Sequence, residues 1–393
     1  MRHHHLPVCL LALLTACKED DPHDSGGSGD SGDPGVGPTA VAQVDPTGGT
    51  VPLTVTLDGS ASVAGDQPIS TWAWSLPDGT VIAGETVETV LLAEGTHPIT
   101  LTVVDEGGRS AEASVEVAAV CPEFDEAAEA GILDWGEVSG MAAASTAGFL
   151  WGHSDAQGDG PVLYAFSTSG ALQGIFTLAG ISDYDWEDIA RGPCSAEGGS
   201  CLYIADTGDN AEIRSSVEIL RVEEPTALDG GTLTGVERFA FTYPDGPRDA
   251  ETLMVDPLTG DILIVERDRD DAGESDIYWA AAPLDGSATT ELTLVGHLTF
   301  GTDPLPGDVD ATGGDISPDG GLVAVRTHDR VWLFARDPAR PVYTAFDNPV
   351  CDTPPVDEAK GEALAFALDG SGYFTGGEGV GEPLHWFGGA GQK

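Results

Sequence analysis

Five times between residue 137 and the C-terminus, the sequence repeats the same pattern. An acidic residue opens a short apolar run, a turn follows, and a second apolar run ends in a polar or charged cluster. The pairs of runs are Glu137–Met141 with Phe149–Asp155, Glu187–Ala190 with Leu202–Asp206, Glu251–Val255 with Ile262–Glu266, Asp315–Asp319 with Leu322–Arg326, and Glu362–Phe366 with Tyr373–Glu378. A repeat of about fifty residues built from short strands is typical of β-propeller blades. The pattern therefore predicts an all-β fold in which equivalent positions converge on one axis.

The repeats also predict how such a ring closes. The first four can each supply about four strands, but the chain ends after three strands of the fifth. Because a ring must cover its free edges, we expect Ala130–Asp134 to add the outermost strand of the last blade. The prediction is a propeller over residues 121–393 with five blades, and six blades are the alternative. Cys121–Ala130, with proline near its start and Gly131 after its end, is expected to form a short helix.

The N-terminal residues indicate export. Arg2 precedes the apolar run Leu6–Ala16, which is too short to cross a membrane. Leu14–Cys17 resembles the bacterial lipobox, which implies a lipid on Cys17, and an ordinary secretory signal is the alternative. Residues 1–17 are thus a predicted lipoprotein signal peptide, and residues 18–37, rich in Asp, Ser, Gly and Pro, a disordered linker. We expect lipid anchoring in the cell envelope, at the outer membrane or cell surface.

The cysteines fit an exported protein. Two of the six lie in the predicted signal, and the four that remain predict two disulfides. Cys194 and Cys201 flank a short turn, so closeness in sequence favours their pairing. That leaves Cys121 to pair with Cys351, although other pairings are open in principle.

Acidic residues dominate the charge of the chain. The sequence contains 66 acidic and 16 basic residues, and its formal net charge is −50. Such a field repels nucleic acid and anionic lipid surfaces, so no nucleic-acid partner is expected. The same field attracts cations and keeps the protein soluble, and a solvated acidic surface is its simplest interpretation.

Residues 38–118 show a different pattern, in which apolar and polar residues alternate. The alternating runs are Leu53–Leu57, Ser70–Ser75, Ile99–Val104 and Ala113–Val117. A period of two with turns between the runs predicts a β-sandwich. Four segments resemble the polycystic-kidney-disease (PKD) repeat: Pro52–Ser62, Trp72–Trp74, Pro77–Gly79 and Gly95–Asp105. The resemblance implies an Ig-like spacer or adhesion domain without catalysis.

The candidate site lies on one face of the predicted propeller, where the loop into each innermost strand meets the loop out of the second strand. The candidate metal ligands are the acids that open the repeats: Glu137, Glu187, Glu251, Asp315 and Glu362. A hard divalent cation, most simply Ca²⁺, would relieve their repulsion. The candidate ligand-binding residues come from the same segments: Asp188, Asp209, Asn210, Arg214, Arg248, Arg267 and Arg326. Alternatively, the arginines pair with the carboxylates and hold the loops without any metal.

Two function classes follow. Glu137–Met141 with Trp151–Asp155, and Glu362–Phe366 with Gly376–Glu378, resemble segments of the bacterial esterase-like phytases and, more distantly, of calcium-dependent gluconolactonase and paraoxonase propellers. This resemblance implies a cation-dependent hydrolase of small esters, lactones or phosphoesters. The other class is a lipid-anchored binding or adhesion module for an extracellular protein or polysaccharide. The order of anchor, spacer, sandwich and propeller favours the second class, because no residue spacing demands catalysis.

Overall fold

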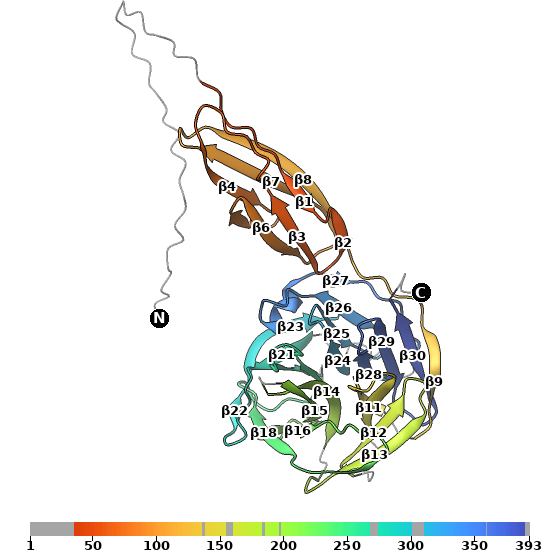
Figure 1. Ribbon diagram of the computed structural model, residues 1–393. Coiled ribbons are helices and arrows are strands. Elements are labelled where there is room, and N and C mark those ends of the chain that lie inside the picture. The colour runs from red at the N-terminus through yellow and green to blue at the C-terminus, as the bar shows by residue number, and fades with distance from the viewer. Residues whose placement is uncertain are drawn as a thin grey trace, which may run out of the picture.

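The computed structural model describes residues 35–135, 138–154, 160–182, 185–195, 198–267, 274–300, 310–358 and 360–389. These residues form an all-β structure in two parts, an elongated sandwich and a larger ring of sheets (Figure 1). The predicted signal peptide, its lipid site Cys17 and nearly all of the predicted linker lie outside the described residues. Within the described ranges, no helix has the length and apolar character needed to cross a membrane.

Two sheets form the sandwich. One contains β1 (Gln43–Asp45), β3 (Leu53–Asp58) and β6 (Thr86–Leu91), and the other contains β2 (Gly48–Thr50), β8 (Ser110–Val120), β7 (Gly95–Asp105), β4 (Ile69–Ser75) and β5 (Val81–Ala83). Buried and less buried residues alternate along β3, so that Leu53, Val55 and Leu57 face the core. Trp74 on β4 is fully buried among them. The alternation seen in the sequence is therefore the division between core and surface.

Five antiparallel sheets follow along the chain. Their main strands are β10 (Val138–Ala143), β11 (Phe149–Ser154), β12 (Val162–Ser167) and β13 (Leu172–Leu178); β14 (Trp186–Ser195), β15 (Gly198–Asp206), β16 (Val217–Glu223) and β18 (Glu237–Thr242); β19 (Ala250–Val255), β20 (Ile262–Glu266), β21 (Glu274–Ala280) and β23 (Thr293–Thr299); β24 (Gly313–Ile316), β25 (Leu322–Arg326), β26 (Val331–Ala335) and β27 (Val350–Cys351); and β28 (Gly361–Phe366), β29 (Gly372–Gly377) and β30 (Glu382–Gly388). Among the described residues, the one helical element is the 3₁₀ turn Val342–Asp347.

The first strands of the sheets meet at the centre of the ring. β10 contacts β14, β14 contacts β19, β19 contacts β24, and β24 contacts β28, which contacts β10 in turn. Figure 1 shows β14, β24 and β28 near the centre of the ring, with later strands such as β18 and β30 farther out. Every residue of β10 and of β19 is buried, as expected of apolar strands that are covered on both faces.

Short parallel strands cover the outer edges of two sheets. β17 (Gly231–Leu233) lies between β16 and β18 in the chain but pairs with β13 of the first sheet. β22 (Thr290–Glu291), from the third repeat, pairs in the same way with β18 of the second sheet. Each of these strands covers an open edge of one sheet. It also links that sheet to the next one, because the strands before and after it in the chain belong to the next sheet. The sequence pattern did not predict these strands.

The segment before the first repeat completes the last sheet. β9 (Ala128–Leu133) pairs antiparallel with β30, as predicted for the residues that precede the first repeat. The predicted helix over Cys121–Ala130 is wrong, because this segment pairs with the exposed edge of β30 and that pairing outweighs local helix propensity. The disulfide between Cys121 and Cys351 fastens the segment to β27. The second predicted disulfide, between Cys194 and Cys201, is also confirmed.

The sandwich touches the ring at the turn between β24 and β25. A Cβ atom added to Gly321 in that turn would lie 3.0 Å from Cγ of Pro52. The buried core of the sandwich is continuous with one part of the ring's core, and this shared cluster includes Val51 of the sandwich and Leu333 of the ring. The contact is at the end of the fourth sheet where β24 finishes and β25 begins. The opposite end of that sheet, where β24 begins, therefore faces away from the sandwich.

Candidate functional site

The start of each first strand lies beside the end of the second strand of the same sheet. Trp186 at the start of β14 pairs with Asp206 at the end of β15, and Ala250 at the start of β19 pairs with Glu266 at the end of β20. The two kinds of loop singled out in the sequence therefore share one end of each sheet. We call this end of the ring the acidic face.

Three of the candidate metal ligands occupy equivalent positions. Glu187 on β14, Glu251 on β19 and Glu362 on β28 each stand where the register between the first and second strands shifts by one residue. Such a bulge turns an extra side chain out of the regular ladder. Asp315 differs, because it pairs regularly with Ala324 on β25. Glu137, the remaining candidate, lies outside the described residues.

Asp188 and Asp315 link neighbouring sheets at the centre of the ring. The carboxylate of Asp188 accepts a hydrogen bond from the N–H of the next residue, at 2.8 Å, and another from Leu253 N on β19, at 2.9 Å. Asp315 accepts two in the same way, from its next residue and from Phe366 N on β28, both at 2.8 Å. Burial raises the pKa of Asp188 well above its usual range and that of Asp315 to about 7. The carboxyl group of Asp188 therefore links β14 to β19, and that of Asp315 links β24 to β28.

A tightly bonded loop follows β15. The N–H of Asp209 donates to Oδ1 of Asp249 at 2.7 Å, and Oδ2 of Asp209 accepts from the N–H of Arg214 at 2.7 Å. The guanidinium of Arg214 then donates to Oδ1 of Asp206 and to the carbonyl oxygen of Gly208, both at 2.7 Å. Arg214 and Asp209 thus fix the loop against the second and third sheets. Asn210, within this loop, is exposed.

A second ion-pair network surrounds Glu251. Nε of Arg267 lies 2.8 Å from Oδ2 of Asp310, and Nη1 of the same arginine contacts Glu251. Burial raises the pKa of Glu251 to about 7. The positive charge of Arg267 lowers this pKa, and the negative charges of Asp249 and Asp310 raise it. The side chain of Glu251 is only 10% exposed, so its ionised form depends on Arg267.

Arg248 forms the third network of the acidic face. Its Nε lies 2.9 Å from Oε2 of Glu266 and 3.2 Å from the hydroxyl oxygen of Tyr278, and its Nη2 contacts Asp245. Burial raises the pKa of Glu266 to about 7, and the charge of Asp276 adds to the rise. Two glutamates on neighbouring strands of one sheet therefore have pKa values well above the usual range.

Arg326 is buried away from the surface. Its side chain is fully enclosed and donates to Oε2 of Glu358 at 3.0 Å and to the carbonyl oxygen of Ala363 at 2.9 Å. Glu358 also bonds Nδ1 of His385 and Oγ1 of Thr375, both at 2.7 Å. This network joins the fourth and fifth sheets, and the enclosed Arg326 cannot reach a ligand at the surface.

The described candidate residues of the acidic face are held in ion pairs and hydrogen bonds. Within the residues that the structure describes, no three His, Cys, Asp or Glu side chains are placed to hold a metal ion. Each candidate arginine pairs with an acid instead: Arg214 with Asp206, Arg248 with Glu266, Arg267 with Glu251, and Arg326 with Glu358. The geometry thus matches the interpretation in which ion pairs hold the loops. Sequence reasoning missed Asp310 and Glu358, which belong to no repeated motif.

Residues 36–120 match the family of PKD domains, so the chain contains the PKD domain that its sequence resembles. PKD domains are typical of extracellular proteins. No curated protein matches the chain.

Three solved structures illustrate what the chain is similar to. The PKD1 domain of the Vibrio cholerae metalloprotease PrtV is 21% identical and covers 21% of this chain and 98% of its own, with a TM-score of 0.19. The PKD1 domain of Vibrio anguillarum Epp is 19% identical and covers 22% and 99%, with a TM-score of 0.20. An auxiliary nutrient binding protein from Bacteroides thetaiotaomicron is 9% identical and covers 91% and 98%, with a TM-score of 0.32. All three TM-scores are below 0.5, so these likenesses carry no functional argument.

Proposed function

We propose that the five-sheet ring is a five-bladed β-propeller and that the protein is an extracytoplasmic binding module with its ligand site on the acidic face. The closed circuit of contacts among the first strands supports the propeller, as does the pairing of β9 with β30. The PKD domain supports an extracellular setting. A lipid on Cys17 would then anchor the chain in the cell envelope, with residues 18–37 as linker, residues 38–118 as spacer and residues 121–393 as binding domain.

The observation that carries this function is the gathering of acids on the acidic face, where Glu251 lies beside Asp249 and Asp310. Glu251 and Glu266 have pKa values raised to about 7, and burial also raises the pKa of Asp185 and of Asp206. Desolvated acids gathered in this way are costly to the fold and are characteristic of functional sites. Arg214, Arg248 and Arg267 balance only part of the acids at this face, because Asp185, Asp249 and Asp310 lie beside the paired acids. The remaining negative charge attracts positive charge, so the partner is a cationic extracellular polymer, either a basic protein segment or an amino-bearing polysaccharide.

The experiment is a binding titration with chitosan oligosaccharide and a lysine-rich peptide as probes. The test variant is Glu251→Gln with Glu266→Gln. The control variant is Glu223→Gln with Glu237→Gln, which removes the same charge from the ends of β16 and β18 that lie away from the acidic face. We expect the test variant to bind at least tenfold more weakly and the control to bind like the wild type. Equal losses in both variants would mean that the chain attracts cations only through its net charge.

A cation-dependent hydrolase is the second candidate, and the pKa of Glu251 favours it. A carboxyl group that titrates near pH 7 suits a general base. Turnover of nitrophenyl esters or phosphoesters that is lost with EDTA and with Glu251→Gln would establish this activity. Absence of turnover, together with a melting temperature that Ca²⁺ does not change, would exclude both the enzyme and the calcium site.

A further inference from the structure

A pocket lies between the second and third sheets, at the opposite end of the ring from the acidic face. Its volume is about 210 Å³. The walls come from the end of β14, the turn between β19 and β20, and the segment that follows β21. Tyr203 on β15 also lines it, and we call it the Tyr203 pocket.

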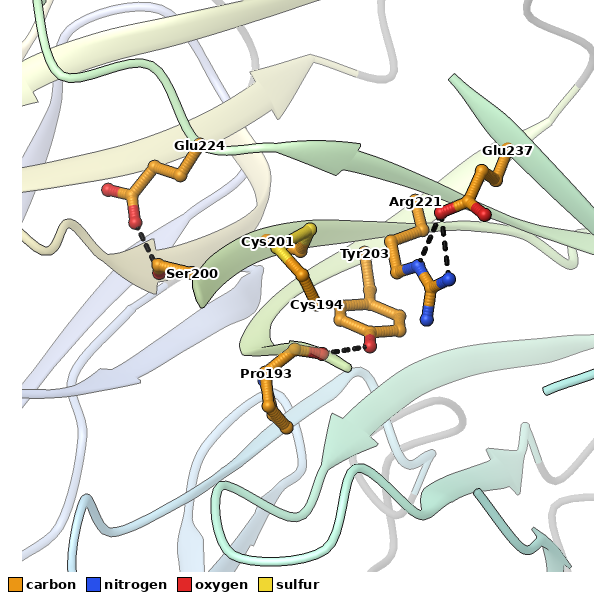
Figure 2. Close-up of a disulfide and its surroundings, with 8 residues drawn as sticks. All are labelled: Pro193, Cys194, Ser200, Cys201, Tyr203, Arg221, Glu224 and Glu237. Atoms are coloured by element: carbon orange, nitrogen blue, oxygen red, sulfur yellow. Dashed lines mark hydrogen bonds and ion pairs between the residues drawn. A yellow bond between two sulfur atoms is a disulfide. The ribbon is translucent and has the colours of Figure 1, made fainter. Parts of the chain in front are cut away.

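The walls are mostly apolar. Pro193, Pro283 and Leu284 line the pocket together with Cys194 of the disulfide and the ring of Tyr203. Figure 2 shows the disulfide beside the tyrosine ring, with Pro193 at the hydroxyl end of that ring. Concave, largely apolar sites with few polar groups are typical of small-molecule binding.

Several lining groups are held in place by bonds of their own. The hydroxyl of Tyr203 donates to the carbonyl oxygen of Pro193 at 2.6 Å (Figure 2). The disulfide fixes Cys194 to the neighbouring strand, and the N–H of Ala282 donates to Oδ1 of Asp261 at 2.9 Å. Walls tied in this way keep their positions without a ligand, which lowers the cost of ordering on binding.

Arg221 is the charged residue that lines the pocket. Its Nε and Nη2 lie 2.8 Å and 2.7 Å from Oε2 of Glu237, and its guanidinium carbon lies 4.8 Å from the centre of the Phe239 ring. Figure 2 shows the third guanidinium nitrogen pointing away from Glu237. The guanidinium also hydrogen-bonds the hydroxyl group of Tyr203, which takes one of the two N–H groups at this end and leaves the other as a donor. Because Glu237 already balances the positive charge, this donor carries no net attraction for anions.

We propose that the Tyr203 pocket binds a small neutral ligand with a flat apolar body and an oxygen that accepts a hydrogen bond from Arg221. The apolar walls and the tyrosine ring fit the body of such a ligand. An anionic ligand fits less well, because the Arg221–Glu237 pair is neutral and the chain as a whole is strongly negative. This site is separate from the acidic face and does not depend on the function proposed for that face.

Benzamide and benzoate test the proposal, since they have nearly the same shape and differ in charge. Saturation-transfer NMR titrations of the full chain would measure both. We expect benzamide to bind with a millimolar dissociation constant, as its small size allows, and benzoate to bind at least fivefold more weakly. Benzoate that binds as tightly as benzamide, or no binding of either probe, would overturn the proposal.

Two variants locate the binding. Ala282→Phe fills the pocket with a ring and is expected to abolish benzamide binding. Arg221→Met keeps the apolar stem but removes the donor, and is expected to weaken binding by about fivefold to tenfold. The matched control is Arg238→Met, which breaks a similar pair with Glu218 on the same sheet but does not line the pocket. Melting temperatures near that of the wild type would show that the variants fold. Benzamide binding that survives both pocket variants would contradict the site.

Discussion

Replacing Arg326 by methionine removes one partner of a buried ion pair. The side chains of Arg326 and Glu358 are both 0% exposed, and Nη1 lies 3.0 Å from Oε2. The substitution leaves the Glu358 carboxylate with only its hydrogen bonds to His385 and Thr375. The carbonyl oxygens of Ala363 and His328 also lose their donor. Breaking a buried pair in this way costs about 3–5 kcal/mol, which lowers the melting temperature of a domain of this size by about 10 °C.

The cost should depend on pH. In the wild type, burial alone would raise the pKa of Glu358, but Arg326, His385 and Thr375 together lower it below the usual range. A carboxyl group with a lowered folded-state pKa stabilises the protein above its unfolded-state pKa, and that stability is lost as the pH falls through the folded-state value. Without Arg326 the pKa of Glu358 rises, so the variant is most destabilised at pH 8, where the buried carboxyl group is ionised without its partner.

Urea unfolding followed by fluorescence at pH 8 and pH 5 measures this effect. The variants are Arg326→Met, Glu358→Gln and the double variant, and Arg238→Met serves as the control because it breaks a solvent-exposed pair that contributes less than about 1 kcal/mol. The double variant should lose less stability than the sum of the single losses. A cost of less than about 1 kcal/mol for Arg326→Met at pH 8, or an equal cost at both pH values, would show that Arg326 does not stabilise the ionised Glu358.

Three further variants test the closure and packing of the ring. Replacing Cys121 and Cys351 by serine opens a loop of 230 residues and should cost about 5 kcal/mol in urea unfolding; an unchanged midpoint would show that the bond does not restrain the unfolded chain. Gly140→Ala places a Cβ 2.7–2.8 Å from backbone atoms of β14 and should cost about 1–3 kcal/mol, and a retained melting temperature would contradict this close approach. Asp315→Asn removes one of two acceptors for backbone N–H groups, so the Phe366 amide should exchange faster by mass spectrometry, whereas unchanged protection would disprove that link.

The sequence predicts the strands of the ring well because strands that are buried on both faces consist of continuous apolar residues. Apolar runs such as Ile262–Val265 are buried along their whole length, so they stand out between turns rich in glycine and acids. The closing role of Ala130–Asp134 was predictable by counting strands. The helix expected over Cys121–Ala130 was not borne out, since the composition of a segment does not reveal that a free strand edge lies next to it.

The candidate site was predicted less completely. The alternation of first and second strands places Glu251 and Glu266 at one end of the ring, as expected. Which acids are bonded to which arginines could not be inferred, because the partners Arg267 and Asp310 lie 43 residues apart in the chain and their contact depends on loop paths. The regular pairing of Asp315 likewise depends on the absence of a bulge in β24, which leaves no trace in the sequence.

Acids from separate strands are buried together at the acidic face, and the proposed binding function depends on this burial. The most direct measurement is a carbon-13 NMR titration of protein labelled at its glutamate carboxyl groups, with Glu251→Gln and Glu266→Gln used to assign the two signals. We expect both carboxyl groups to titrate near pH 7. If every glutamate titrates at its ordinary pKa of about 4.3, these side chains are not buried as the structure places them, and the proposed binding face loses its support.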